Sequence, residues 1–360
     1  MTTSAVQQPA REGVPGIVDV AGLDEYFAAN VAGAVPPLRY TVIAGGHSNL
    51  TYRVDDAAGN RFVLRRPPLG HILASAHDMG REHRIISAVG RSDGAVPVAP
   101  ALALSADDSV NGAPFYVMGF VDGHVLATEE DVEANVADHT ARYRLGEDVA
   151  DILARLHQLD VDAIGLGELA RRDGFLDRQL KRWRGQWEAA KTRELPAMEE
   201  TYELLLQAKP EQRHTGIVHG DYRLGNMLSL AEGRIAAVLD WELCTLGDVL
   251  ADVGYLLNNW GEPGDPEIGL NLDPPPTCAP GFPSREAFVA RYAERTGVDT
   301  SVIAYYQAFS HWRLASIGEG VKRRYLEGVM VDDTFPLEDY DHRIAVRANV
   351  ALDLIRGLNG

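Results

Sequence analysis

Cysteine is scarce in this sequence, and so is positive charge. Only Cys244 and Cys278 occur among 360 residues, which is too few for a disulfide framework, and neither lies in a spacing typical of a zinc site. The 34 lysines and arginines face 52 aspartates and glutamates, so the net charge is −18. Such an acidic chain is poorly suited to bind nucleic acid or an anionic membrane. We therefore expect a protein of the reducing cytoplasm that has neither nucleic acid nor a membrane as a partner.

Long apolar runs are also missing. No stretch reaches the roughly 20 apolar residues that cross a bilayer. The amino-terminal sequence MTTSAVQQPAREGVPG lacks the basic start and apolar stretch of a signal peptide. The composition that remains is that of an ordinary globular protein, with 46% hydrophobic and 24% charged residues. A chain of this length and composition can form two lobes, each with its own core.

The pattern of apolar residues changes after the first third of the chain. Residues 1–18 are polar and without periodicity, so we predict a mobile tail. For residues 19–121 we predict a small lobe with a short helix, antiparallel strands in YTVIAGG, LTYRV and RFVLRR, a helix in REHRIISAVG and two more strands. For residues 122–360 we predict a mostly helical lobe, with helices in residues 143–160, 173–191, 197–208, 249–260, 284–297 and 301–328. The predicted fold class is α+β.

Polar residues are concentrated in two short stretches, VHGDYRLGNML and AAVLDWELCTLGD. Asp221, Asn226 and Asp240 carry hard oxygen donors, which suit a magnesium ion that completes its shell with water and substrate phosphates. Arg223 would place a permanent cation near the same point, where charge develops on a transferring phosphoryl group. The alternative is a capped turn in which Asp221 and Asn226 bond their own backbone. The spacing of all three oxygen donors favours the metal-phosphate site.

The run HGDYRLGN followed by VLDWE resembles the motifs of the aminoglycoside phosphotransferase and choline kinase-like family, relatives of the protein kinases. The resemblance extends from about Val42 to Gly328 and is closest to a kinase-like branch found fused to acyl-CoA dehydrogenases. Segments such as GGHSNLTYRV, REHRIISAV and LDWELCTLGD carry that closer match. The resemblance implies a bilobal, protein kinase-like fold and a phosphotransferase that uses ATP and Mg²⁺ with an alcohol group as acceptor.

The resemblance also implies roles for the residues of the second lobe. Asp221 corresponds to the catalytic carboxylate that orients the acceptor hydroxyl, and Arg223 to a cation that contacts the γ-phosphate. Asn226 and Asp240 correspond to the metal ligands. His219 is expected to be buried and to support the loop, although a catalytic base is the alternative. Two further acidic residues are expected to brace the lobe or cap a helix: Asp248 and Asp252.

In the first lobe, GGHSNLTYRV resembles the hairpin that covers the nucleotide, and Ser48 and Asn49 are the expected phosphate contacts. The adenine is expected to lie against Val63 and Met118, with its edge bonded by the hinge from Gly119 to Val121.

The usual kinase lysine is replaced in RFVLRR. The period of two places Val63 and Arg65 on one face, so Arg65 is expected to reach the phosphates, and Arg66 is the alternative. Glu82 matches the helix glutamate that pairs with this cation. Its alternative is a solvated charge beside neighbouring arginines.

The acceptor is expected to be a small molecule, because Asp240 is followed at once by LGDVLADVGYLL, which leaves no room for the activation segment of a protein kinase. The related branch is associated with hydroxyacyl-CoA thioesters. Cations for such an anionic substrate are found in two helical runs: Arg178, Lys181, Arg182, Arg184, Lys322, Arg323 and Arg324. Trp183 and Trp187 could stack on the acceptor, although solvated charges and core packing are the common uses of such residues.

Other readings remain open. An aminoglycoside, choline or sugar kinase would share every ATP-side residue, and an ATP-binding regulatory module without transfer is possible if Arg65 fails to replace lysine. A metallophosphoesterase would need further paired His and Asp motifs, which are not found. A homodimer and a functional link to an acyl-CoA dehydrogenase are possible as well, and the sequence does not decide the oligomeric state. The loop from Asn258 to Pro283, rich in proline and glycine, is expected to cover the acceptor site.

Overall fold

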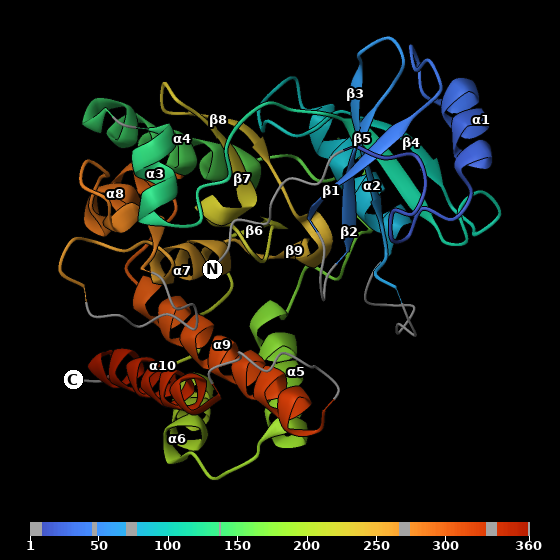
Figure 1. Ribbon diagram of the computed structural model, residues 1–360. Helices are drawn as coiled ribbons and strands as arrows, with labels where there is room; N and C mark the ends of the chain where they lie inside the picture. The colour runs from blue at the N-terminus through green and yellow to red at the C-terminus, as the bar shows by residue number, and fades with distance from the viewer. Residues whose placement is uncertain are drawn as a thin grey trace. The chain divides into compact units, whose positions relative to one another are not determined.

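The computed structural model describes residues 9–44, 49–69, 78–136, 138–265, 274–328 and 337–358. The chain divides into two compact units, and each is described by itself (Figure 1). The first comprises Met1–Asp122 and Ala236–Glu242, and the second comprises Gly123–Ile235 and Leu243–Gly360. Among the described residues, no helix combines the length and the apolar character needed to span a bilayer.

The first unit is built on an antiparallel five-stranded sheet in the order β1-β2-β3-β5-β4. Its strands are β1 (Arg39–Ala44), β2 (Leu50–Asp55), β3 (Arg61–Arg66), β4 (Ala101–Ser105) and β5 (Phe115–Gly119). The turn between β2 and β3 is held by Asp56, whose carboxylate accepts the N–H groups of Ala58 and Asn60. Helix α2 (Met79–Gly90) lies against β4 and β5. The predicted antiparallel sheet with one companion helix is therefore confirmed.

A second helix and the amino-terminal segment cover part of this sheet. Helix α1 (Val20–Asn30) contributes Leu23 and Phe27 to a core shared with strand residues. The residues before α1 differ from the prediction of a mobile tail. Ala10 pairs with Tyr40, and Val14 and Ile17 are buried in the same core. The tail prediction is wrong for residues 10–18 because these apolar side chains find a place against the sheet, and residues 1–8 lie outside the described residues.

The second unit is mostly helical, as predicted. Its helices are α3 (Glu129–Asn135), α4 (His139–His157), α5 (Phe175–Ala190), α6 (Pro196–Gln207), α7 (Leu250–Asn258), α8 (Arg285–Thr296), α9 (Ile303–Leu326) and α10 (Leu337–Gly357). Helices α3 and α10 were not predicted. Helix α10 packs on α9 and α6, and its buried residues recur at helical spacing: Ile344, Ala348, Ala351, Leu352 and Ile355. Figure 1 shows α10 in red beside α9.

Short strands position the HGD motif within the second unit. Strand β6 (Thr215–Val218) pairs with β9 (Thr245–Asp248) in antiparallel register, with Val218 opposite Thr245. The chain leaves β6 directly into the motif, makes a short 3-10 turn at Leu224–Asn226 and enters β7 (Met227–Leu230), which forms a two-stranded sheet with β8 (Arg234–Val238). Because apolar strand residues anchor both ends, the polar loop between them has a defined path.

Candidate active site

The loop that follows β6 requires glycine at its second position. Gly220 has φ +86°, a conformation that side chains with a Cβ rarely adopt. A Cβ at Gly220 would also lie 2.9 Å from the main-chain oxygen of Leu243. The glycine therefore allows a close approach of two chain segments immediately before Asp221.

Both carboxylate oxygens of Asp221 accept hydrogen bonds. Oδ2 accepts from Nδ2 of Asn226 at 2.7 Å, and Oδ1 accepts from the hydroxyl of Tyr255. Nε of Arg223 lies 3.4 Å from Oδ1. The side chain of Asp221 nevertheless keeps 22% of its surface exposed. The carboxylate is thus fixed in orientation and still accessible to a small molecule.

Asn226 directs its amide nitrogen toward Asp221 twice. Nδ2 donates to the main-chain oxygen of Asp221 at 2.8 Å as well as to its carboxylate. Because the amide group is planar, its oxygen points away from these bonds. Asn226 therefore has the orientation expected of an oxygen ligand for a hard cation.

Buried polar residues hold the loop from behind. His219 is fully buried, as predicted, and its Nδ1 accepts the N–H of Asp221 at 3.3 Å. Asp252 accepts the N–H of His219 at 2.6 Å and of Gly220 at 2.8 Å, and it lies 3.3 Å from Nε2 of His157. Burial alone would raise the pKa of Asp252, but the bonds from His157 and the backbone lower it below its ordinary value.

Asp248 is a second buried carboxylate of this unit. It accepts a hydrogen bond from the hydroxyl of Tyr306 at 2.7 Å and from the N–H of Leu250, at the start of α7, at 3.2 Å. Burial raises the pKa of Asp248 despite these bonds. Its contacts are those of a residue that joins β9 to two helices.

The two arginines of β3 have different surroundings in the first unit. Nε of Arg65 lies 3.1 Å from the buried Glu82, and Nη2 lies 2.7 Å from Asp240 and 3.7 Å from Glu242. Arg66 instead donates to main-chain oxygens of Gly16 and Asn111. Adjacent strand residues project to opposite faces of the sheet, so Arg65, and not Arg66, lies beside Glu82, Asp240 and Glu242.

Arg65 and Glu82 shift each other's pKa values. Burial raises the pKa of Glu82, and the guanidinium of Arg65 opposes that rise. Burial would lower the pKa of Arg65, but the carboxylate of Glu82 and its acidic neighbours raise it. Glu82 is therefore a buried partner of Arg65 rather than a solvated charge.

Asp240 has an unusual backbone conformation. Its φ of +60° lies in the left-handed region, which costs most non-glycine residues of order 1 kcal/mol and which aspartate adopts more readily than most. The carboxylate is 28% exposed. Within the described ranges, no group of three or more His, Cys, Asp or Glu side chains could hold a metal ion. A cation bound by Asp240 would need amide, water or phosphate oxygens as well, which is the donor set of Mg²⁺.

The residues predicted to contact adenine lie on neighbouring strands. Val63 on β3 is opposite Met118 on β5, so their side chains share one face of the sheet. The N–H of Gly119 donates to the main-chain oxygen of Pro100 at 2.8 Å and is already used. Adenine would therefore have to bond the carbonyl of Gly119 or the backbone of Val121.

Asn49, a predicted phosphate contact, has another partner in the structure. Its side chain is buried, and Nδ2 donates to Glu242 at 3.2 Å. Its amide oxygen has no hydrogen-bond partner among the described residues. Ser48, the other predicted phosphate contact, lies outside the described residues.

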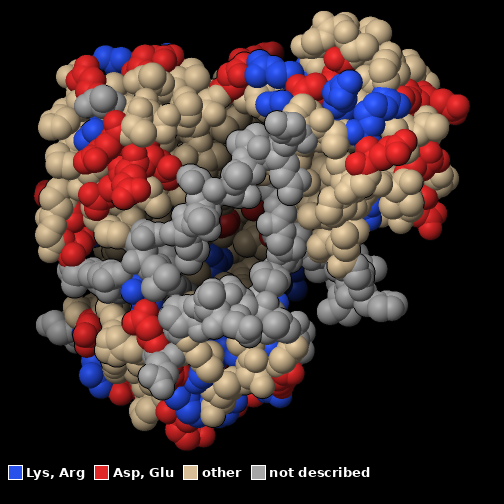
Figure 2. Space-filling model, in the orientation of Figure 1, with Lys and Arg blue, Asp and Glu red and all other residues tan. Residues whose placement is uncertain are grey.

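Several predicted acceptor-side cations are already neutralised. Arg184 pairs with Glu188 and Glu199, while Lys322 pairs with Asp341. The remaining cations of the two runs divide as follows: Arg323 pairs with Glu327, Arg178 donates to main-chain oxygens, and Lys181, Arg182 and Arg324 have no ion pair within the described ranges. Figure 2 shows basic and acidic side chains interspersed where α5, α6 and α10 lie in Figure 1. The two runs therefore do not form one continuous basic surface.

The two tryptophans of the first run, Trp183 and Trp187, differ in burial. Trp187 is fully buried, and its Nε1 donates to Glu199 at 2.9 Å, so it packs in the core, which was the alternative to stacking on an acceptor. Trp183 is only partly buried, and the guanidinium of Arg313 lies 5.8 Å from its ring centroid. Only Trp183 retains a surface for a ligand.

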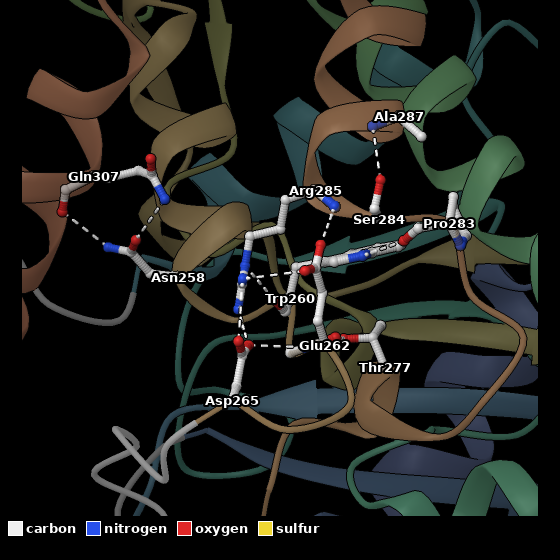
Figure 3. A network of polar contacts seen from close by, with 11 residues as sticks. Asn258, Trp260, Glu262, Asp265, Thr277, Pro283, Ser284, Arg285, Ala287 and Gln307 are labelled. Carbon is white, nitrogen blue, oxygen red and sulfur yellow. Dashed lines mark hydrogen bonds and ion pairs between the residues drawn. The ribbon is translucent and has the colours of Figure 1, made fainter.

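The described ends of the loop between Asn258 and Pro283 are pinned by hydrogen bonds (Figure 3). Arg285 donates Nε to the main-chain oxygen of Trp260 at 2.8 Å, and its N–H donates to Glu262 at 2.6 Å. Nε1 of Trp260 donates to the main-chain oxygen of Pro283 at 2.9 Å. Residues 266–273 of this loop lie outside the described residues. The function predicted for the loop stays a prediction.

Sequence reasoning missed two residues that lie beside Asp221. Tyr255 donates to its carboxylate, and Arg313 donates to the main-chain oxygen of Gly220 at 3.1 Å. A signal existed only for Arg313, a charge within the apolar stretch AFSHWRLASIG of α9. Helical spacing alone could not show which residues the guanidinium of Arg313 contacts.

Comparison with known proteins gives a consistent family. Residues 39–297 match the model of the phosphotransferase enzyme family. Mouse acyl-CoA dehydrogenase family member 10 is 34% identical over 294 residues, which are 81% of this chain and 27% of that protein. The probable acyl-CoA dehydrogenase IBR3 of Arabidopsis thaliana is 33% identical over 335 residues, which are 86% of this chain and 39% of that protein. The chain thus spans about a quarter to two fifths of the length of these curated relatives.

Solved structures show the same fold. A Ralstonia eutropha protein classed with the aminoglycoside phosphotransferases superposes with a TM-score of 0.80 at 31% identity, covering 94% of this chain and 98% of that one. An aminoglycoside phosphotransferase solved with AMP-PNP and hygromycin B superposes with a TM-score of 0.60 at 16% identity, covering 92% and 98%. At that lower identity, the likeness shows a common kinase-like fold alone.

Proposed function

This chain belongs to the phosphotransferase enzyme family, and we propose that it transfers the γ-phosphoryl group of ATP to the hydroxyl of a small molecule. The observation that carries the proposal is the state of Asp221. Its carboxylate is oriented by Asn226 and Tyr255 and remains partly exposed, as a group that receives a hydroxyl proton must be.

On the acceptor side, Asp221 accepts the proton of the substrate hydroxyl. The hydroxyl oxygen attacks the γ-phosphorus, a new P–O bond forms, the bond to the bridging β–γ oxygen breaks, and ADP leaves. Arg223, close to Asp221, supplies a fixed positive charge for the phosphoryl oxygens. Such catalysis consists mainly of positioning and charge neutralisation.

On the nucleotide side, we assign Arg65 to the phosphates and Glu82 to holding Arg65 in place, because the two form a largely buried pair. Val63 and Met118 are the proposed walls for adenine, and Gly119 and Val121 the proposed backbone contacts at its edge. Ser48 and Asn49 remain proposed phosphate contacts from the preceding hairpin. Asn49 would have to exchange its bond with Glu242 for one to phosphate.

We expect Arg65→Met to lower kcat/KM for ATP by about 100-fold, because a buried, charge-assisted contact to phosphate is lost. Steady-state kinetics with varied ATP would measure the effect. Arg61→Met is the matched control, since Arg61 lies on the same strand and forms an exposed pair with Asp122. If Arg66→Met produced the larger kinetic defect, the assignment of Arg65 would be incorrect.

Asn226 and Asp240, each described within its own unit, are the proposed magnesium ligands. Mg²⁺ held by these two residues would supply positive charge that offsets the negative charge of the ATP phosphates. The orientation of the Asn226 amide and the partly exposed carboxylate of Asp240 both support the assignment.

We expect Asp240→Asn to raise the Mg²⁺ concentration for half-maximal activity by about tenfold, because a charged ligand becomes neutral. A magnesium titration at fixed ATP would measure this shift. Asp55→Asn is the control, since Asp55 pairs with Arg53 at the end of β2. An unchanged magnesium requirement would remove Asp240 from the ligand set.

For the acceptor we propose a hydroxyacyl-CoA thioester, because the mouse and Arabidopsis relatives carry acyl-CoA dehydrogenase names. The test is incubation with Mg-ATP and a panel of 3- and 4-hydroxyacyl-CoAs, choline, sugars and aminoglycosides, followed by mass spectrometry. A gain of one phosphoryl group on a thioester is the expected result. Phosphorylation of another class alone would overturn the acyl-CoA assignment, and absence of ATP binding would overturn the kinase.

A further inference from the structure

Arg313 is a charged residue beside Asp221 that the proposed reaction has not yet used. It belongs to α9, and its Nη2 donates to the main-chain oxygen of Gly220 at 3.1 Å, one residue before Asp221. Its guanidinium lies 5.0 Å from the ring centroid of Tyr255, whose hydroxyl donates to the carboxylate of Asp221. Arg313 is thus linked to Asp221 by two independent contacts.

Arg313 forms no ion pair with any residue that the structure describes. Within the described ranges no carboxylate lies within 4.0 Å of its guanidinium, in contrast to Arg184 and Lys322. Its Nε is buried and has no hydrogen-bond partner among the described residues. A guanidinium that has no carboxylate partner can donate charge-assisted hydrogen bonds to an oxygen of a ligand.

Aromatic rings restrict the motion of this guanidinium. Trp183 and Tyr255 lie 5.8 Å and 5.0 Å from it by ring centroid. Stacking of this kind stabilises a cation but leaves its in-plane N–H donors available. Arg313 is therefore held ready to donate hydrogen bonds to an oxygen on the acceptor.

We propose that Arg313 binds the acyl carbonyl oxygen of the acceptor and so selects a hydroxyacyl thioester. The inference rests on the proposed function, because it takes the acceptor hydroxyl to lie at Asp221. Arg313 contacts Gly220, next to Asp221, so the substrate group that it binds must lie only a few bonds from the acceptor hydroxyl. In a hydroxyacyl-CoA, that group is the acyl carbonyl. The phosphates of CoA lie at the far end of the pantetheine arm. A cationic aminoglycoside would be repelled by the same guanidinium.

The test uses two acceptors and two variants of the full chain. The acceptors are a hydroxyacyl-CoA and its thioether analogue, in which a CH₂ group replaces the carbonyl. Arg313→Gln removes the charge, and Arg313→Lys retains it without the planar fork. Arg144→Gln is the matched control, because Arg144 also donates to a main-chain oxygen, that of Glu232, elsewhere in the unit.

We expect the wild-type protein to show a KM for the thioether about tenfold higher than for the thioester. Arg313→Gln should raise the KM for the thioester by a similar factor and remove the preference, while the KM for ATP changes by less than about twofold. Arg313→Lys should retain part of the preference, and Arg144→Gln all of it.

Three results would overturn the inference while leaving the kinase proposal intact. They are equal use of both acceptors by the wild-type protein, a uniform loss of kcat in Arg313→Gln with the preference retained, and transfer to aminoglycosides alone. If both Arg313 variants fail to fold, the wild-type comparison of the two acceptors still decides. Failure of the wild-type protein to phosphorylate any acceptor would instead refute the proposed function.

Discussion

The Asp221→Asn variant is expected to lose kcat by about a thousandfold while still binding ATP. Asparagine has the same shape as aspartate, so the loop can retain its path. Its neutral amide cannot accept a proton from the acceptor hydroxyl, however, and general-base assistance is worth about 10² to 10⁴ in rate. Release of ADP in the presence of acceptor would measure kcat, and calorimetry would measure ATP affinity.

The control for this variant is Asp160→Asn. Asp160 caps an exposed turn by accepting the N–H groups of Asp162 and Ala163, away from the HGD loop in sequence and in contacts. Its replacement should leave kcat unchanged. Substantial transfer by Asp221→Asn, with Asp160→Asn normal, would show that Asp221 is not the proton acceptor.

The second large effect is expected on stability. Asp252→Asn should lower the free energy of unfolding by about 3 kcal/mol, because a fully buried carboxylate that accepts two backbone N–H groups is replaced by an amide with one oxygen. The NH₂ group of the asparagine would face one of these N–H donors and could not accept its hydrogen bond. Urea denaturation would measure the loss, and kcat should fall as well, since His219 and Gly220 carry the chain into Asp221.

Asp248→Asn is a matched comparison for Asp252→Asn. Asp248 is also buried and accepts two hydrogen bonds, but burial already raises its pKa, and one of its donors is the hydroxyl of Tyr306, which can also accept a bond. A neutral side chain is therefore tolerated better at 248, and the loss of stability should be smaller. Equal losses in the two variants would contradict the role of Asp252 as the anchor of the loop.

The pH dependence of unfolding gives an independent check on Asp252. The pKa of Asp252 is lowered in the folded protein from an ordinary value of 3.8, so the ionised form stabilises the fold above that pH. This contribution is lost as the pH falls further, through the folded-state pKa. The wild-type protein should therefore lose stability more steeply than Asp252→Asn below about pH 4. Parallel profiles would indicate that folding does not lower the pKa of Asp252.

Much of the fold was predictable because its signals are local. The strands of the first unit alternate over short runs, and the helices of the second unit carry apolar residues at helical spacing. The errors have local causes too. Val14 and Ile17 are isolated apolar residues in a polar segment, and α10 was overlooked although Ile344, Ala348 and Ala351 mark its buried side. Such segments become ordered because they pack against a neighbouring surface. The residues of that surface are distant in the sequence, so a short stretch of sequence does not reveal it.

The sequence alone determined the class of chemistry. The order and spacing of Asp221, Asn226 and Asp240 resemble the motifs of the phosphotransferases, and the match of residues 39–297 to the phosphotransferase enzyme family confirms that class. The identity of the family follows from the same residues. Neither conclusion required knowledge of which side chains meet.

Only the tertiary structure decided which side chains support those residues. Arg65 and Arg66 are adjacent in sequence, and only the sheet determines that Arg65 faces Glu82 while Arg66 faces Gly16. Tyr255 and Arg313 follow Asp221 by 34 and 92 positions, yet both lie beside it. Contacts between distant segments depend on how helices pack, and packing is a property of complementary surfaces rather than of local pattern.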